Sequence, residues 1–201
     1  MCANVYMRTK SLQSYKNILI FPNFQGFFFI FFANIKYFLY LCADKSKIDM
    51  TKILFICHGN ICRSPMAEFL FRHLADQAGR SEDFEVASAA VSDEETGNDL
   101  YPPAKRTLAA HGIPFTRHAA RKITRADYTY YDHIICMDRS NLRLLRYVIG
   151  DDTAGKVSLL MQWCNESHDV ADPWYTGDFE TTYRDLLQGC TALLGNLNAD
   201  E

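Results

Sequence analysis

The sequence lacks the features that define several large classes of protein. It carries 21 lysines and arginines against 24 aspartates and glutamates, a net charge of −3, so it has no basic excess for general nucleic-acid binding. Its seven cysteines are odd in number and do not follow the spacing of a secreted disulfide scaffold, which indicates a reducing cytoplasm. No internal repeat or low-complexity linker follows Met50. We therefore expect a cytoplasmic enzyme or binding domain that does not bind nucleic acid.

The sequence has one cluster of cysteine and histidine residues and lacks the second cluster that a structural zinc site usually requires. Cys57, His58 and Cys62 lie close together, but structural zinc sites usually take paired ligands from two places in the chain. We therefore expect neither a metal nor a cofactor. An alternative that stays open is that Cys57 and Cys62 are ordinary buried thiols.

The N-terminal region differs in composition from the rest of the chain. Eight of the 14 phenylalanines precede Met50, all of them in the apolar stretch 18–42, which is about long enough for the ~20 residues that span a bilayer. Polar residues interrupt this stretch, and a signal peptide matches it only faintly. We expect residues 1–49 to be an extension of doubtful status and 50–201 to be the working domain. Membrane contact is expected only if 18–42 is a genuine span.

The most informative stretch is Cys57–Pro65, which reads CHGNICRSP and follows the apolar run Ile53–Ile56. Five residues separate Cys57 from Arg63, enough to form a loop whose backbone N–H groups converge while the guanidinium closes the rim. Such a concavity fits a phosphate dianion without a metal. A helix that starts near Ser64 would add its positive end to the same site.

The loop also contains a candidate nucleophile. A helix N-terminus and a nearby arginine favour the thiolate form of Cys57. Gly59 and Asn60 tolerate the unusual backbone angles that such a loop requires. We expect the Ser64 hydroxyl to donate to the Cys57 sulfur and to help it depart. Cys62 is close enough in sequence for a reversible disulfide with Cys57.

The stretch from Ile53 to Pro65 resembles the low-molecular-weight protein tyrosine phosphatases, whose signature is a strand followed by Cys-x-x-Asn-x-Cys-Arg-Ser. Far downstream, the sequence DPWY at 172–175 resembles the segment that carries the general acid of that family, and GDFETTY at 177–183 continues the likeness. The likeness covers about Lys52 to Leu194. Other segments that resemble the family are Val86–Ala89, Tyr101–Ala104, His111–Ile113 and Tyr131–Asp138.

This resemblance implies a metal-independent phosphatase that acts on phosphotyrosine-containing proteins or small aryl phosphates. Its catalytic residues would be Cys57 as nucleophile, Arg63 as phosphate ligand and Asp172 as general acid and base. His118 matches a family position that hydrogen-bonds the loop asparagine. The remaining substrate-binding positions would be His58, Gly59, Asn60, Ile61, Cys62, Ser64, Trp174 and Tyr175.

Asp172 also fits the general acid on chemical grounds, because phenolate leaves phosphate poorly unless it is protonated. Pro173 restricts the backbone beside it, although an Asp-Pro turn is the simpler alternative. Trp174 and Tyr175 can form the wall of an aromatic slot for a phosphotyrosine ring. Ordinary packing of these two aromatic residues is the alternative.

Departures from the family pattern leave other functions open. His58 replaces a small or apolar residue of the family. The segment Asp93–Glu95 is acidic where relatives carry an aromatic residue at the pocket mouth, so we expect it to repel acidic peptides.

Three alternative functions remain open. A protein-arginine phosphatase would have threonine at the position of Ile61. A thioredoxin-coupled arsenate reductase would need a further close cysteine pair, yet Cys164 and Cys190 are 26 residues apart. A non-catalytic phosphoprotein-binding module is the third alternative.

The predicted strands and helices alternate along the chain, which indicates βαβ units and a parallel sheet. With the family resemblance, we expect an α/β fold with an open doubly wound sheet of four parallel strands and helices on both faces. In the first helix, Glu68, Arg72 and Asp76 should lie on the side away from the sheet. The predicted strands are Lys52–Cys57, Phe84–Ser88, His133–Met137 and Lys156–Leu160, and the predicted helices are Pro65–Ala78, Ala104–His111, Asn141–Ile149 and Phe179–Leu194.

Overall fold

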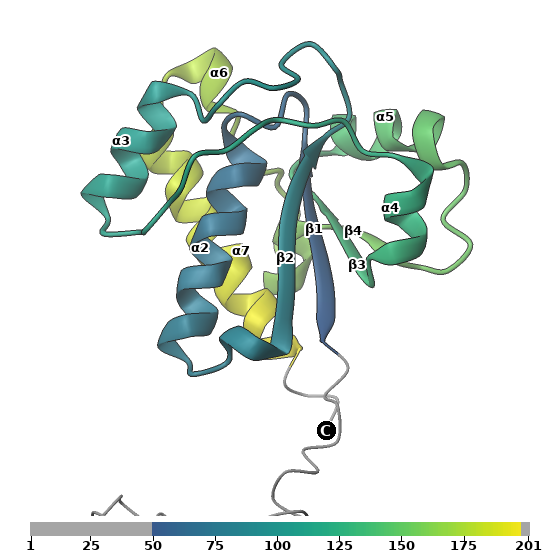
Figure 1. Cartoon of the computed structure of the whole chain (residues 1–201), viewed down its shortest axis with the longest axis horizontal. Helices are drawn as coiled ribbons and strands as arrows, with labels where there is room; N and C mark the ends of the chain where they lie inside the picture. Colours follow the sequence, from purple (N-terminus) through teal and green to yellow (C-terminus); the bar gives the residue numbers. More distant parts are fainter. Residues whose placement is uncertain (1–49, 198–201) are drawn as a thin grey trace, which may run out of the picture. The chain divides into compact units, whose positions relative to one another are not determined.

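The computed structural model describes residues 50–197, so the predicted extension 1–49 and its apolar stretch 18–42 lie outside the described residues. Four parallel strands form one sheet in the order β2-β1-β3-β4 (Figure 1). The strands are β1 (Thr51–Cys57), β2 (Phe84–Ala90), β3 (His133–Cys136) and β4 (Val157–Leu159). The predicted fold class is confirmed.

Six α-helices and two short 3-10 helices accompany these strands within the described part of the chain. The four predicted helices are present with shifts of one to two residues at most of their ends, and two short helices, α4 and α6, were not predicted. The α-helices are α2 (Arg63–Gln77), α3 (Pro102–Ala110), α4 (Arg125–Tyr130), α5 (Arg139–Ile149), α6 (Pro173–Thr176) and α7 (Phe179–Asn196). The 3-10 helices are η2 (Ser81–Asp83) and η3 (Leu160–Cys164). Within residues 50–197, none of the helices is both long and apolar enough to cross a membrane.

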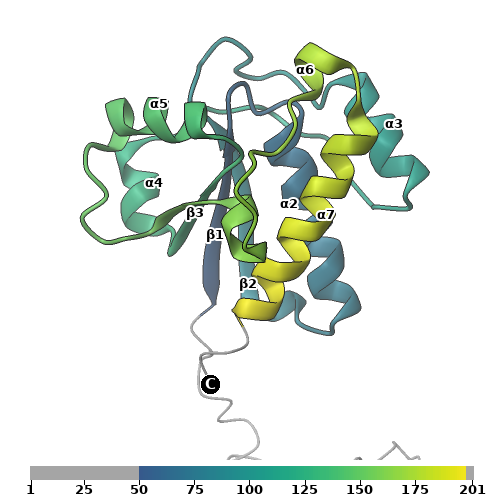
Figure 2. The same cartoon turned by 180° about the vertical axis from the view of Figure 1, so that it is seen from behind.

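Both faces of the sheet are covered, and the alternation of side chains along β1 shows why. Ile53 and Phe55 point into one buried cluster, whereas Leu54 and Ile56 point into the other. All four are fully buried, as expected for a central parallel strand covered on both sides. Figures 1 and 2 show α2, α3 and α7 over one face and α4 and α5 over the other.

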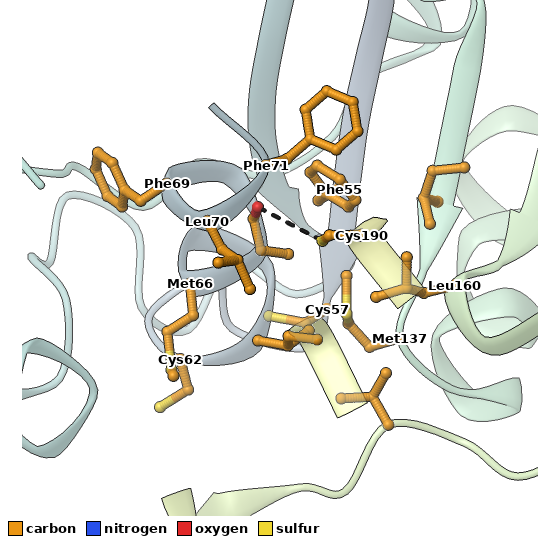
Figure 3. Packing of buried hydrophobic residues seen from close by; sticks show 14 of the residues in the cluster. Phe55, Cys57, Cys62, Met66, Phe69, Leu70, Phe71, Met137, Leu160 and Cys190 are labelled. Atoms are coloured by element: carbon orange, nitrogen blue, oxygen red, sulfur yellow. Dashed lines mark hydrogen bonds between the residues drawn. The ribbon is translucent and has the colours of Figure 1, made fainter. Parts of the chain in front are cut away.

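The register of the strands brings several chain segments to one edge of the sheet. Ile56 in β1 pairs with Ala89 in β2 and with Cys136 in β3, so the carboxyl ends of three strands lie side by side. Cys57 and Met137 follow directly and are buried in the same cluster, at 3% and 0% exposure (Figure 3). In open α/β sheets this edge is where ligands bind.

The prediction for the polar side of α2 was wrong at one residue. Glu68 is buried, at 7% exposure, and its carboxylate accepts a hydrogen bond from Ser88 on β2 at 2.6 Å. Arg72, one turn later, bonds both Glu68 and the carbonyl oxygen of Val86, while Asp76 is exposed as predicted. The edge of α2 that carries Glu68 therefore lies against β2.

Candidate active site

The Cys57 sulfur lies at the centre of the loop that joins β1 to α2. Asn60 has a positive φ of 59°, a left-handed conformation that asparagine tolerates better than most residues. This turn directs the Asn60 backbone N–H at the Cys57 sulfur, at 3.2 Å. The Ser64 hydroxyl lies 3.0 Å from the same sulfur. Helix α2 begins one residue earlier, and its N-cap residue makes no side-chain capping bond, so its first N–H groups are available to an anion.

The loop rests on a buried layer of polar side chains. The side-chain amide nitrogen of Asn60 donates to the hydroxyls of Ser64 at 3.0 Å and Ser88 at 2.8 Å. His118 lies on the other side of Asn60, where Nε2 donates to its backbone oxygen at 2.9 Å. Asn60 and Ser64 are completely buried. These contacts fix the shape of the loop from behind, since buried hydrogen-bonded groups have few alternative positions.

Arg63 is nearly buried, at 3% exposure, and two carboxylates hold its guanidinium. One terminal nitrogen lies 2.6 Å from Asp138 and the other lies 2.6 Å from Asp172. Burial lowers the pKa of Arg63, but Cys57, Asp172 and Asp138 outweigh this effect and raise the pKa above its ordinary value. Arg63 is therefore a fixed positive charge beside the sulfur.

Asp172 comes from the segment before α6 and is the N-cap of that helix. One carboxylate oxygen accepts from the Trp174 backbone N–H at 3.1 Å, and the other bonds Arg63. The Trp174 ring contacts the Tyr101 ring at a centroid distance of 5.5 Å, yet Trp174 and Tyr175 are 58% and 85% exposed. This side of the site is much more open to solvent than the loop.

These two sides enclose a cavity of about 200 Å³. Nine of the predicted site residues line it, namely Cys57, His58, Gly59, Ile61, Cys62, Arg63, Asp172, Trp174 and Tyr175. Asn60, Ser64 and His118 are not in the lining, because they lie in the layer behind the loop. Glu94 and Glu95 complete the wall, and Glu94 lies 3.2 Å from the His58 ring.

Sequence reasoning missed three residues that take part in this arrangement. Asp138 follows β3 directly and bonds Arg63; its place at the carboxyl end of a neighbouring strand was a readable signal. Ser88 and Glu68 support the loop through Asn60. No sequence signal distinguishes Ser88 from any other small strand residue, and the helical spacing of Glu68 pointed the wrong way.

Three other described thiols, Cys62, Cys136 and Cys190, are poor nucleophiles. Burial, together with Cys57 and Asp172, raises the pKa of Cys62 to about 12, so this thiol stays protonated at neutral pH. Burial also raises the pKa of Cys136 and of Cys190, both of which have no exposed surface. Within residues 50–197, no group of three or more histidine, cysteine, aspartate or glutamate side chains is placed to hold a metal ion.

Comparison with known families gives one match over most of the chain. The model of the family described as low molecular weight phosphotyrosine protein phosphatase matches residues 52–201. The match therefore includes the loop, Asp138 and the segment that carries Asp172.

Individual relatives agree with this match. The low molecular weight protein-tyrosine-phosphatase YfkJ of Bacillus subtilis is 35% identical over 154 residues, which cover 76% of this chain and 99% of YfkJ. The crystal structure of YfkJ superposes with a TM-score of 0.73, covering 76% of this chain and 98% of that one. The human low molecular weight phosphotyrosine protein phosphatase is 40% identical over 147 residues, 71% of this chain and 92% of the human one. A Drosophila arginine phosphatase of known structure is 30% identical, with a TM-score of 0.68, and covers 75% of this chain and 100% of its own.

Proposed function

Because this chain belongs to the low molecular weight phosphotyrosine protein phosphatase family, we propose that it hydrolyses phosphotyrosine by double displacement through a cysteinyl phosphate. One observation carries the proposal: Cys57, Arg63 and Asp172 line a single cavity. A nucleophile, an anion ligand and a proton donor are the three groups that this reaction needs. We also propose that residues 50–201 form the phosphatase domain and that it works in the reducing cytoplasm.

In the first step the Cys57 thiolate attacks phosphorus in line with the phenolic oxygen. The new S–P bond forms as the O–P bond breaks, and the departing oxygen takes the bond pair together with a proton from Asp172. The backbone N–H of Asn60 points at the sulfur, at 3.2 Å, and the positive start of α2 faces the anion that the loop binds. Arg63 and the loop N–H groups hold the three equatorial oxygens.

The contacts of Arg63 suggest how substrate binding releases the acid. Asp138 and Asp172 each bond one terminal nitrogen of the guanidinium. We propose that a phosphate dianion takes over the nitrogen that bonds Asp172, because a bidentate phosphate contact is stronger than a single-point one. Asp138 would keep its bond and hold the guanidinium plane. Asp172 would then be free to carry a proton to the leaving oxygen.

In the second step Asp172, now ionised, accepts a proton from water as the water oxygen attacks phosphorus. The S–P bond breaks and its electron pair returns to the Cys57 sulfur, which regenerates the thiolate and releases inorganic phosphate. The Ser64 hydroxyl lies 3.0 Å from that sulfur and would stabilise its returning charge. The same carboxyl thus serves as acid in the first step and as base in the second.

The cavity wall favours an aromatic leaving group. Ile61 contributes an apolar side chain to the lining, and Trp174 and Tyr175 stand at the mouth, where a phenyl ring can stack. The similarity to a Drosophila arginine phosphatase makes phosphoarginine the second candidate substrate. Ile61 offers no hydroxyl to bond a guanidinium, so we place phosphotyrosine first.

Two other functions have less support. An arsenate reductase that relays oxidation would need accessible cysteines, yet Cys136 and Cys190 are fully buried in β3 and α7. A binding module without turnover would not need a carboxyl group such as Asp172 against the arginine.

The test is turnover of matched phosphotyrosine and phosphoarginine peptides by the full chain in the presence of a metal chelator. We expect hydrolysis of the phosphotyrosine peptide, at least about tenfold faster than of the phosphoarginine peptide, since the pocket stacks a ring but offers no partner to a guanidinium. A preference for phosphoarginine would reverse the order of the two substrates. No turnover of either would exclude the proposed reaction.

A further inference from the structure

A continuous series of hydrogen bonds runs from the side of α2 to the nucleophile. The Ser88 hydroxyl lies 2.6 Å from the Glu68 carboxylate, and the Asn60 side-chain nitrogen lies 2.8 Å from Ser88 and 3.0 Å from Ser64. The Ser64 hydroxyl then lies 3.0 Å from the Cys57 sulfur. All five side chains are at least nine-tenths buried, so water does not compete for these bonds.

The orientation of the Asn60 amide is fixed from outside this series. The backbone N–H of Arg121 lies 3.1 Å from the side-chain oxygen of Asn60. A backbone N–H can only donate, so the atom that faces Arg121 must be the oxygen. The NH₂ group of Asn60 therefore faces the two serines, and each of its hydrogens has one acceptor.

The carboxylate at the far end determines the direction of the bond that it shares with Ser88. An ionised carboxylate only accepts, and the other Glu68 oxygen forms an ion pair with Arg72 at 2.8 Å. Ser88 must then donate to Glu68 and accept from Asn60.

The second Asn60 hydrogen goes to Ser64, so the Ser64 oxygen accepts and its own proton remains to be placed. Two acceptors lie near it: the Cys57 sulfur at 3.0 Å and the Ala89 carbonyl oxygen at 3.4 Å. The nearer one is the sulfur, and a thiolate is the charged acceptor of the two.

From this geometry we propose that Glu68 is a positioning residue. By accepting the Ser88 proton it leaves Ser88 free to accept from Asn60, and so holds the Asn60 amide where its second hydrogen reaches Ser64 and the Ser64 proton faces the Cys57 sulfur. Glu68 does not touch the substrate and acts only through Ser88, Asn60 and Ser64. Resting on the function proposed above, its effect falls on breakdown of the cysteinyl phosphate, where negative charge returns to the sulfur.

The direct test replaces Glu68 by glutamine, which keeps its size but can donate. The new amide oxygen would stay on Arg72, and its NH₂ group would face Ser88, which would then receive two donors and lose the acceptor for its own proton. We expect kcat to fall about tenfold, the loss typical of a disturbed bond to a charged group. A burst of phenol release should precede the slower steady state, because breakdown slows more than formation.

Matched variants separate this role from a structural one. Asp76→Asn removes a carboxylate from the exposed side of the same helix and should change neither kcat nor the burst. Glu68→Gln combined with Ser64→Ala should be no more than about twofold slower than Ser64→Ala alone, since both changes act on the same bond. If Glu68→Gln does not fold, Ser88→Ala interrupts the series one step nearer the loop and should give the same burst.

Independent, multiplicative losses in the double variant, or a Glu68→Gln enzyme with the wild-type burst and kcat, would overturn the proposal. An inactive wild-type chain would instead contradict the function on which it rests.

Discussion

The two sides of the cavity are built differently. The loop side, from Cys57 to Ser64, is supported by a layer of buried side chains that leaves its asparagine, arginine and serine at 0–3% exposure. The opposite side consists of Asp172 and a four-residue helix, with Trp174 and Tyr175 largely exposed. The comparison indicates a rigid anion site opposite an adaptable wall. Phosphate recognition needs fixed donors, whereas the leaving group varies from substrate to substrate.

The largest effect is expected at the nucleophile on the rigid side. Cys57→Ser should reduce turnover of a phosphotyrosine peptide by at least about 10³-fold, because a hydroxyl lacks the low pKa and nucleophilicity of a thiol. Cys164→Ser, which changes a thiol outside the cavity, is the control and should retain activity. Equal activity in the two variants would exclude Cys57 as the nucleophile.

The next largest effect is expected on the adaptable side. Asp172→Asn should lower kcat for a phosphotyrosine peptide by about 10²–10⁴-fold, the range of general acid catalysis. The loss should be smaller for p-nitrophenyl phosphate, whose leaving group needs less protonation. Asp169→Asn, in a residue that pairs with Arg139 instead, is the matched control. The same loss with both substrates would argue against an acid role.

Stability should distinguish the two sides most clearly. Asn60→Ala removes the left-handed asparagine and its buried bonds, and we expect a loss of about 2–4 kcal/mol in the free energy of unfolding. Trp174→Ala should cost less than about 1 kcal/mol, as for most exposed positions. Urea unfolding at neutral pH measures both. Similar losses would remove the distinction between rigid and adaptable sides.

A smaller effect is expected from charge at the cavity mouth. Glu94 and Glu95 should favour phosphotyrosine peptides with basic neighbours over peptides with acidic ones. We compare the kcat/KM for a peptide with basic neighbours with the kcat/KM for a peptide with acidic neighbours. Glu94→Gln should reduce the ratio of the first value to the second by about threefold, as expected for a solvent-exposed charge pair. Asp93→Asn, whose carboxylate faces Lys122 outside the lining, should leave the ratio unchanged. A ratio that both substitutions change equally would indicate a general charge effect.

The smallest effect is expected on the stability of the fold at low pH, through Asp99. Its carboxylate accepts from the backbone N–H of His118 at 3.0 Å, and His118 in turn bonds Asn60 in the loop. Hydrogen bonds from Lys105 and from the His118 backbone lower the pKa of Asp99 from 3.8 to about 2. Because the folded pKa is below the unfolded one, its stabilisation is present above about pH 4 and is lost as the pH falls towards 2. The difference in unfolding free energy between wild type and Asp99→Asn should shrink over this range. A constant difference would contradict the assignment.

The sequence alone predicted the loop, the alternation of strands and helices, and nine residues that the structure brings to one cavity. The six lining residues between Cys57 and Arg63 were predicted because the chemistry of the loop is local, and the sheet was predicted because strands that alternate with helices form βαβ units. Asp172, Trp174 and Tyr175 were predicted mainly from the family resemblance of their segment. Helix α4 was missed because six residues are too few to show the 3.6-residue repeat of apolar positions that marks a helix. The capping box that Thr124 and Asp127 form at its start was the available signal. Glu68 was misplaced because helical spacing does not show that Ser88 on a neighbouring strand approaches the same face of α2.

The most direct test of the account is detection of the covalent intermediate. The full chain carrying Asp172→Asn would be mixed with a phosphotyrosine peptide, quenched in denaturant within milliseconds to seconds, digested and mapped by mass spectrometry. The account predicts one phosphoryl group on Cys57, and none when Cys57→Ser is added. Turnover without any phosphoryl-enzyme, or a phosphoryl group on His58 instead, would contradict it.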